Sequence, residues 1–148
     1  MADLYKYPYF DASVFIGFIK DETVEGVERG GIADYLLKQA RDGIFRICTS
    51  TLTLAEVHKL RRGPRLDVDS SQKLLLFFEE PFFAFVDVDR DIGEQANEFC
   101  RRFNIYPNDA IHLASAIRAK CDVLLAWDNR FVHVNHPEIL IEEPEMRT

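Results

Sequence analysis

The chain has 148 residues, 47% of them hydrophobic, with 18 lysines and arginines against 25 aspartates and glutamates, a formal net charge of −7. Taken as a whole, this charge argues against a partner as negative as a nucleic acid. The length suits one compact domain, so we expect residues 1–148 to form a single domain that needs no disulfide or metal merely to fold. The apolar content excludes an intrinsically disordered chain.

The sequence carries no sign of export or of a membrane. Residues 1–6 lack the basic and apolar regions of a signal peptide, and no apolar run reaches the roughly 18 residues of a membrane span. The three cysteines are scattered and form no metal-binding motif: Cys48, Cys100 and Cys121. We therefore expect a cytoplasmic protein with reduced thiols and no membrane contact.

Short apolar runs alternate along the chain with helical patterns. In chain order we expect a strand over 7–12, helices over 14–19 and 32–39, a strand over 45–49, helices over 52–60 and 72–78, a strand over 82–88, helices over 92–103 and 110–119, a strand over 123–127 and a weaker one over 139–141. Continuous apolar runs suit strands that are buried on both faces. This order predicts an α/β fold, a three-layer α/β/α sandwich with a mostly parallel sheet of four to five strands.

Local signals predict where several helices begin or end. Gly43 is expected to end the helix over 32–39, and Asp87, Asp89 and Asp91 are expected to serve as strand-end and capping residues. N-caps are expected at Thr51, at Ser70 or Ser71, and at Asn108.

Two carboxylates in the first half of the chain interrupt apolar sequence. Asp11 ends the first predicted strand, and Glu56 lies among apolar neighbours in the helix after the second. An unpaired carboxylate in such surroundings costs several kcal/mol. The structural alternatives are an N-cap for Asp11 and a solvated helix position for Glu56.

Two more acids follow the same pattern in the second half. Asp109 begins a helix that is apolar nearly all round, and Asp128 directly follows the strand over 123–127. Taken alone, Asp109 could cap its helix and Asp128 could form a turn.

Together, these four acids point to a shared site. In open α/β sheets, ligands bind outside the carboxyl ends of the strands, which is the edge that all four residues face. Four converging acids repel one another unless a cation neutralises them. Oxygen ligands favour Mg²⁺ or Mn²⁺, and such a metal supports in-line displacement at phosphorus.

Four segments in this order and spacing resemble the PIN-domain ribonucleases, and most closely the VapC-type toxins of toxin–antitoxin pairs. The resemblance spans nearly the whole chain and rests on residues 10–16 (FDASVFI), 53–57 (TLAEV), 108–116 (NDAIHLASA) and 125–131 (LAWDNRF). It maps the acidic quartet of the family onto Asp11, Glu56, Asp109 and Asp128. Ser13 matches the small hydroxyl residue that helps to order the metal site.

The resemblance implies a Mg²⁺- or Mn²⁺-dependent endonuclease that cuts RNA, a homodimer, and an antitoxin that blocks the site. Two departures leave the number of metals open. Trp127 stands where the family usually has a small hydroxyl residue, and Asn129-Arg130 replaces a second acidic residue. Our hypothesis is that Asp11, Glu56 and Asp109 hold one metal and that Asp128 holds the same metal or helps to place a second.

Other functions remain open at this stage. The chain could be a non-catalytic RNA- or protein-binding module of the same fold, or a housekeeping RNA-processing nuclease. An aspartyl-phosphate hydrolase is disfavoured because Ser13 stands where such enzymes need a second aspartate. The phosphate-binding motifs GxxxxGK[ST] and GxGxxG are absent from the sequence.

RNA binding and histidine chemistry have weaker candidates. The predicted RNA-binding residues are Lys59, Arg61, Arg62, Arg65 and Arg130, with a solvated helix end as the alternative for the first four. His112 follows Asp109 by three residues and could be a ligand or base, but its apolar neighbours favour a hydrogen-bonded core histidine. His58 has no stronger claim. Trp127 could stack on a base, but core packing is favoured for a residue that ends a buried strand.

The position of the charges removes the argument that the net charge raised against a nucleic-acid partner. The acids at 21, 22, 25 and 28 contribute −4, and the segment 138–148 contributes −3 from four acids and Arg147, so these two segments hold the entire −7. The remainder balances at 17 acids and 17 bases, and four of those acids form the quartet that a metal would neutralise. Net charge therefore leaves RNA binding open.

Overall fold

The computed structural model describes residues 4–20, 23–24, 26–58, 65–127, 131 and 133–147. Five strands form one sheet in the order β5-β4-β1-β6-β7, and all four pairings are parallel. The strands are β1 (Pro8–Phe10), β4 (Ile47–Ser50), β5 (Phe83–Val86), β6 (Val123–Leu125) and β7 (Leu140–Glu142). Each overlaps a predicted strand and extends at most one residue beyond it, so the α/β class and the parallel sheet are confirmed.

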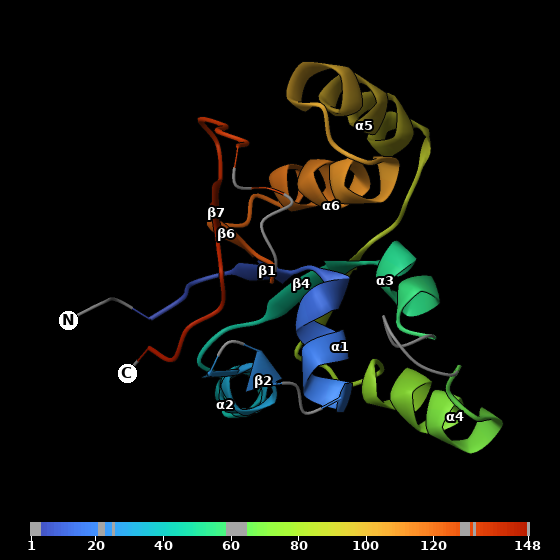
Figure 1. The fold of residues 1–148 in the computed structure, drawn as a ribbon, viewed down its shortest axis with the longest axis vertical. Helices are drawn as coiled ribbons and strands as arrows, with labels where there is room; N and C mark the ends of the chain where they lie inside the picture. Colours follow the sequence, from blue (N-terminus) through green and yellow to red (C-terminus); the bar gives the residue numbers. More distant parts are fainter. Residues whose placement is uncertain are drawn as a thin grey trace.

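Helices cover both faces of the sheet (Figure 1). They are α1 (Ala12–Lys20), α2 (Arg29–Arg41), α3 (Thr51–Glu56), α4 (Val68–Phe77), α5 (Arg90–Phe103) and α6 (Pro107–Arg118). α1 and α2 pack on one face, whereas α5 and α6 pack on the other. None of the helices in the described residues is long and apolar enough to cross a membrane.

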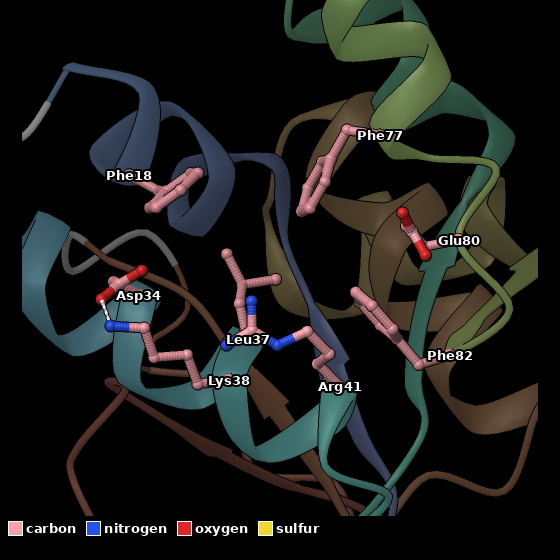
Figure 2. Close-up of a pocket in the computed structure, with 8 residues that line it drawn as sticks. All are labelled: Phe18, Asp34, Leu37, Lys38, Arg41, Phe77, Glu80 and Phe82. Carbon is pink, nitrogen blue, oxygen red and sulfur yellow. Dashed lines mark ion pairs between the residues drawn. The ribbon is translucent and has the colours of Figure 1, made fainter.

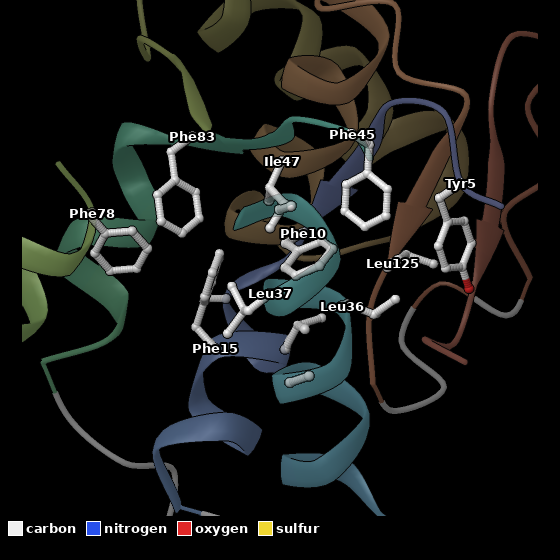
Figure 3. Packing of buried hydrophobic residues seen from close by; sticks show 14 of the residues in the cluster. Tyr5, Phe10, Phe15, Leu36, Leu37, Phe45, Ile47, Phe78, Phe83 and Leu125 are labelled. Atoms are coloured by element: carbon white, nitrogen blue, oxygen red, sulfur yellow. The ribbon is translucent and has the colours of Figure 1, made fainter. Parts of the chain in front are cut away.

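Phenylalanines fill much of the face that α1, α2 and α4 cover (Figure 3). We call six of them the phenylalanine cluster: Phe15, Phe77, Phe78, Phe82, Phe83 and Phe85. The Phe83 ring lies 5.2 Å from the ring of Phe77 and 5.3 Å from that of Phe78, centroid to centroid. Such tilted and edge-to-face pairs suit the aromatic quadrupole and fill volume densely.

Alanines of α6 line part of the opposite face. Ala110, Ala114 and Ala116 on α6 are buried against the sheet and α5. Because these side chains are short, α6 can lie close to the strands, and its polar residues come near the carboxyl end of β1. This close approach carries α6 residues into the candidate site.

Helix ends follow the sequence signals only in part. Gly43 adopts a φ of 84° after α2, and the Ile92 N–H donates to the Asp89 side chain at the start of α5, as predicted. α3 is capped by Ser50, not Thr51, because the Ser50 Oγ accepts from the Leu52 N–H at 3.0 Å. Thr51 Oγ1 instead accepts from the Val88 N–H.

Two other cap predictions were wrong. α4 begins at Val68, where the Asp67 carboxylate accepts from the Ser70 N–H at 2.7 Å, so Ser70 and Ser71 lie inside the helix. α6 begins at Pro107, whose fixed φ suits a first helical position, so Asn108 lies inside the helix. A short antiparallel ribbon was not predicted: β2 (Thr23–Val24) and β3 (Val27–Glu28), with Gly26 at a φ of 80°.

The strand order places a topological switch point beside β1. The chain runs from β1 to β4 and β5 on one side of the sheet, and then returns to β6 and β7 on the other side. Connections therefore leave in opposite directions at the carboxyl ends of β1 and β6, which is where open α/β sheets bind ligands.

Candidate active site

Asp11 lies at this switch point, directly after β1. Its backbone N–H donates to the Leu125 carbonyl at 3.0 Å, and its Oδ2 accepts from the Ser13 N–H at 3.1 Å. The residue is only 1% exposed. Asp11 thus caps α1, as the structural alternative expected, and also presents a buried carboxylate at the ligand-binding edge.

Ser13 joins the ends of two strands. Its Oγ accepts from the Trp127 N–H at 2.9 Å, so the start of α1 is bonded to the residue that follows β6. The positioning role of Ser13 stays a prediction. Trp127 is buried, with the Arg29 guanidinium 5.0 Å from its ring centroid, so it packs in the core rather than offering a face to a base. Asp128 lies outside the described residues.

Asp109 reaches the same edge from α6. It stands in the first turn of the helix, where the macrodipole favours a negative charge, and it is 1% exposed. Its charge acts on His112, one turn further along α6.

Glu56 is the last residue of α3, and its side chain is 23% exposed. Its Oε1 lies 2.5 Å from His112 Nε2, and its Oε2 accepts from the Asn108 Nδ2 at 3.3 Å. Both carboxylate oxygens are thus engaged by α6. The solvated helix position is therefore wrong for this residue.

His112 is the centre on which these contacts converge. It is 0% exposed; its Nδ1 lies 2.7 Å from the Tyr9 hydroxyl, and its Nε2 lies 3.5 Å from Asp11 Oδ1. Burial lowers the pKa of His112, but Asp11, Glu56 and Asp109 raise it more, so the net pKa lies above its ordinary value. The burial of His112 agrees with the predicted core histidine. Its contacts with Asp11 and Glu56, however, also make it part of the candidate site.

Two buried hydroxyls support the site and were not predicted. Thr49 Oγ1 donates to the Phe10 carbonyl at 2.8 Å and lies 2.7 Å from Thr53 Oγ1. They bond the end of β4 and the helix that carries Glu56 to the residue before Asp11. The available signal was the four hydroxyl residues among positions 49–53, which is unusual beside a buried strand.

The donor chemistry fits a hard divalent cation, because the converging groups are carboxylates. Within the described residues, however, no group of three or more histidine, cysteine or acidic side chains is arranged to hold a metal ion. Asp11 and Asp109 are buried at the edge, while Glu56 contacts His112. The predicted fourth position, Asp128, is outside these residues.

Most of the predicted RNA contacts cannot be placed. Lys59, Arg61, Arg62 and Arg130 lie outside the described residues, whereas Arg65 is described and exposed. His58 is exposed, and its Nδ1 lies 2.6 Å from the Ala55 carbonyl at the end of α3. These observations leave the RNA-binding residues as predictions.

A separate pocket of about 230 Å³ lies between α1, α2 and the end of α4 (Figure 2). Its lining residues are Phe18, Asp34, Leu37, Lys38, Arg41, Phe77, Glu80 and Phe82. The floor is aromatic and aliphatic, and charged side chains surround it, with Lys38 bound to Asp34 at 2.8 Å. None of the described acids of the site is among the lining residues.

Comparison with known proteins finds a family model that matches most of the chain. The family model of the PIN domain matches residues 9–137. No curated protein sequence is matched.

The chain is similar in fold to three solved structures, each less than 20% identical to it in sequence. VapC20 of Mycobacterium tuberculosis, a Sarcin-Ricin loop cleaving toxin, has 19% identity and a TM-score of 0.65, over 90% of this chain and 98% of its own. A toxin–antitoxin complex from Klebsiella pneumoniae has 18% identity and a TM-score of 0.64, over 90% of this chain and 95% of its own. DNA-bound VapBC from Salmonella typhimurium has 18% identity and a TM-score of 0.62, over 95% of this chain and 98% of its own.

Proposed function

Since the chain belongs to the PIN domain family, which matches it over residues 9–137, we propose that it is a metal-dependent endoribonuclease and the toxin of a toxin–antitoxin pair. The observation that carries this proposal is the contact of Asp11 and Glu56 with the same buried His112 at the switch point of the sheet, where Asp109 is buried in the first turn of the helix that carries His112. Carboxylates gathered at such an edge suit chemistry at a phosphodiester.

In this proposal, Asp11, Glu56, Asp109 and Asp128 hold Mg²⁺ or Mn²⁺. The bound metal would activate water and stabilise the leaving oxygen of the phosphodiester. Ser13 and the buried hydroxyl pair Thr49–Thr53 keep the ends of β1, β4 and β6 in register, so that the carboxylates keep their separation.

RNA is the proposed substrate because a structural neighbour, VapC20, is a toxin that cleaves the Sarcin-Ricin loop. Lys59, Arg61, Arg62, Arg65 and Arg130 are the proposed phosphate contacts. These basic side chains would neutralise the phosphates of the RNA backbone, which the acidic side chains of the site would otherwise repel.

The test compares Asp11→Asn with the parent on a looped RNA. We expect cleavage with Mg²⁺ or Mn²⁺, loss of cleavage on adding EDTA, and a rate at least about 100-fold lower for Asp11→Asn, because removing even a group that only orients a metal ligand costs about 10–100-fold. The matched control is Asp122→Asn, at the opposite end of β6, where Asp122 accepts from the Tyr7 N–H. Equal rates for Asp11→Asn and the parent would refute the nuclease proposal.

The same samples separate this proposal from a non-catalytic module. A folded parent that binds RNA but neither Mn²⁺ nor Mg²⁺, measured by calorimetric titration, would favour a binding function. Activity without toxicity on expression would favour a housekeeping nuclease.

We propose an antitoxin as the protein partner, because two of the neighbours are structures of toxin–antitoxin or VapBC complexes. The pocket between α1, α2 and α4 suits an apolar side chain of that partner, with Asp34, Lys38, Arg41 and Glu80 available to charged groups around it. The homodimer stays a prediction, which light scattering on the purified chain tests.

A further inference from the structure

A buried histidine joins three elements of the site. His112 on α6 lies 2.7 Å from the Tyr9 hydroxyl on β1 through Nδ1, and 2.5 Å from Glu56 Oε1 on α3 through Nε2. Tyr9 and His112 are both 0% exposed. The rings meet edge to face, with their centroids 5.7 Å apart. The Tyr9–His112–Glu56 relay therefore fixes the imidazole from two sides.

The relay acts on a carboxylate at the end of a short helix. Glu56 ends the six-residue helix α3, and a glutamate has three rotatable side-chain bonds. Asn108 and His112 are four residues apart on α6 and so lie on one face of it. One donates to Oε2 and the other contacts Oε1, so α6 selects a single orientation of Glu56.

The relay does not depend on the charge of the imidazole. A carboxylate only accepts, so His112 Nε2–H donates to Glu56 in both the neutral and the charged ring. The Tyr9 hydroxyl can donate to Nδ1 or accept from Nδ1–H. Burial raises the pKa of Tyr9 well above its ordinary value, so its hydroxyl keeps its proton.

Packing alone does not explain these partners. A histidine that only fills the core can satisfy its nitrogens with backbone groups. In this ring, Nε2 instead contacts the Glu56 carboxylate and lies 3.5 Å from Asp11 Oδ1. On its other side, the ring is held by a tyrosine two residues before Asp11. The contacts thus connect two acids of the site through one rigid group.

We propose that His112, anchored by Tyr9, is a positioning residue that orients the Glu56 carboxylate beside Asp11 for divalent-cation binding. This inference rests on the proposed function, since it assigns a task to the same acids. Groups that orient metal ligands in this way typically change metal affinity or activity about 10- to 100-fold when removed.

The test uses the full chain and three substitutions. His112→Ala removes the ring, His112→Gln keeps a donor that can reach Glu56, and Tyr9→Phe removes only the anchoring hydroxyl. Tyr5→Phe is the matched control, because Tyr5 is also buried and its hydroxyl accepts one hydrogen bond, from the Glu145 N–H, away from the acids.

Two readouts are needed: Mn²⁺ affinity by calorimetry, and the ¹³C NMR signal of the Glu56 carboxyl in metal-free protein. We expect about 10- to 100-fold weaker Mn²⁺ binding for His112→Ala, a smaller loss for Tyr9→Phe, partial recovery in His112→Gln and no change in Tyr5→Phe. The loss should fall on kcat more than on KM, since the substrate contacts remain.

The NMR readout separates failure of this inference from failure of the proposed function. A parent that neither binds Mn²⁺ nor cuts RNA refutes the nuclease. The positioning role is refuted if the Glu56 carboxyl signal is the same in the parent and in folded Tyr9→Phe and His112→Ala. This holds whether or not the parent binds Mn²⁺ or cuts RNA. Should His112→Ala fail to fold, Tyr9→Phe alone decides: parental Mn²⁺ affinity and an unmoved Glu56 signal overturn the inference.

Discussion

The carboxyl edge of the sheet and the phenylalanine cluster are held together by opposite means. At the edge, buried polar groups are fixed by directed hydrogen bonds, such as Thr49 to the Phe10 carbonyl and His112 to Glu56. In the cluster, rings fill space, with Phe82 and Phe83 4.7 Å apart between centroids. Directed bonds set positions, whereas apolar burial supplies most of the folding free energy.

Because the two regions are stabilised differently, we expect substitutions in them to have different effects. A substitution in the cluster should lower stability and leave the chemistry of each folded molecule intact. A substitution at the edge should do the reverse, because an isosteric change keeps the volume and removes a charge or a directed bond.

Phe83→Ala should give the largest effect on stability. The side chain is buried among at least four other rings, so we expect a loss of roughly 3–5 kcal/mol in the free energy of unfolding, measured by urea denaturation. Mn²⁺ affinity of the folded fraction should match the parent. Weaker Mn²⁺ binding under fully folding conditions would show that the cluster and the site are coupled.

Asp109→Asn should produce the opposite pattern. We expect RNA cleavage to fall at least about 100-fold, about 2.7 kcal/mol in transition-state stabilisation. The amide has nearly the same shape as the carboxylate, so the free energy of unfolding should change less than in Phe83→Ala. Cleavage at the parental rate with Mg²⁺ present would remove Asp109 from the site.

The two regions also differ in how far the sequence predicts them. Continuous apolar runs marked the strands, and the interruption of such a run located Asp11 at the end of β1. The ribbon of β2 and β3 was missed because two-residue strands give no periodic signal. The capping hydroxyl was assigned to Thr51 instead of Ser50 because adjacent hydroxyl residues give the same local pattern.

The relay could not be predicted from spacing alone. His112 stands 103 residues from Tyr9 and 56 from Glu56, and only the fold brings them together. Its neighbours in sequence are apolar, which is also the pattern of a core histidine. Asp11 follows β1 and Asp109 stands in the first turn of α6, and the carboxyl ends of parallel strands and the starts of the following helices share one edge of the sheet. Their role as metal ligands stays a prediction.

The pocket beside the phenylalanine cluster gives a third, intermediate case. Phe18→Ala removes a ring from the pocket lining and should weaken binding of the antitoxin about 10-fold, as expected for an aromatic contact in a protein interface. Binding is measured with the protein encoded by the preceding reading frame. Phe103→Ala, which removes a partly buried ring on α5, is the control; equal losses in both variants would contradict the assignment of the pocket.

The smallest effect is expected at Asp89, an exposed residue that caps the start of α5. The Arg118 guanidinium, bound at 2.6 Å, and the Ile92 N–H hold the pKa of Asp89 below its usual value of 3.8. Because the folded pKa is the lower one, this stabilisation is present above pH 3.8 and is lost as the pH falls through the folded pKa. Asp89→Asn should therefore lower Tm slightly at neutral pH, and the difference from the parent should vanish in acid. Asp91→Asn is the control, since Asp91 is 82% exposed and lies 3.6 Å from Arg118. A Tm difference for Asp89→Asn that persists in acid would mean that the loss comes from the shape of the cap rather than from its charge.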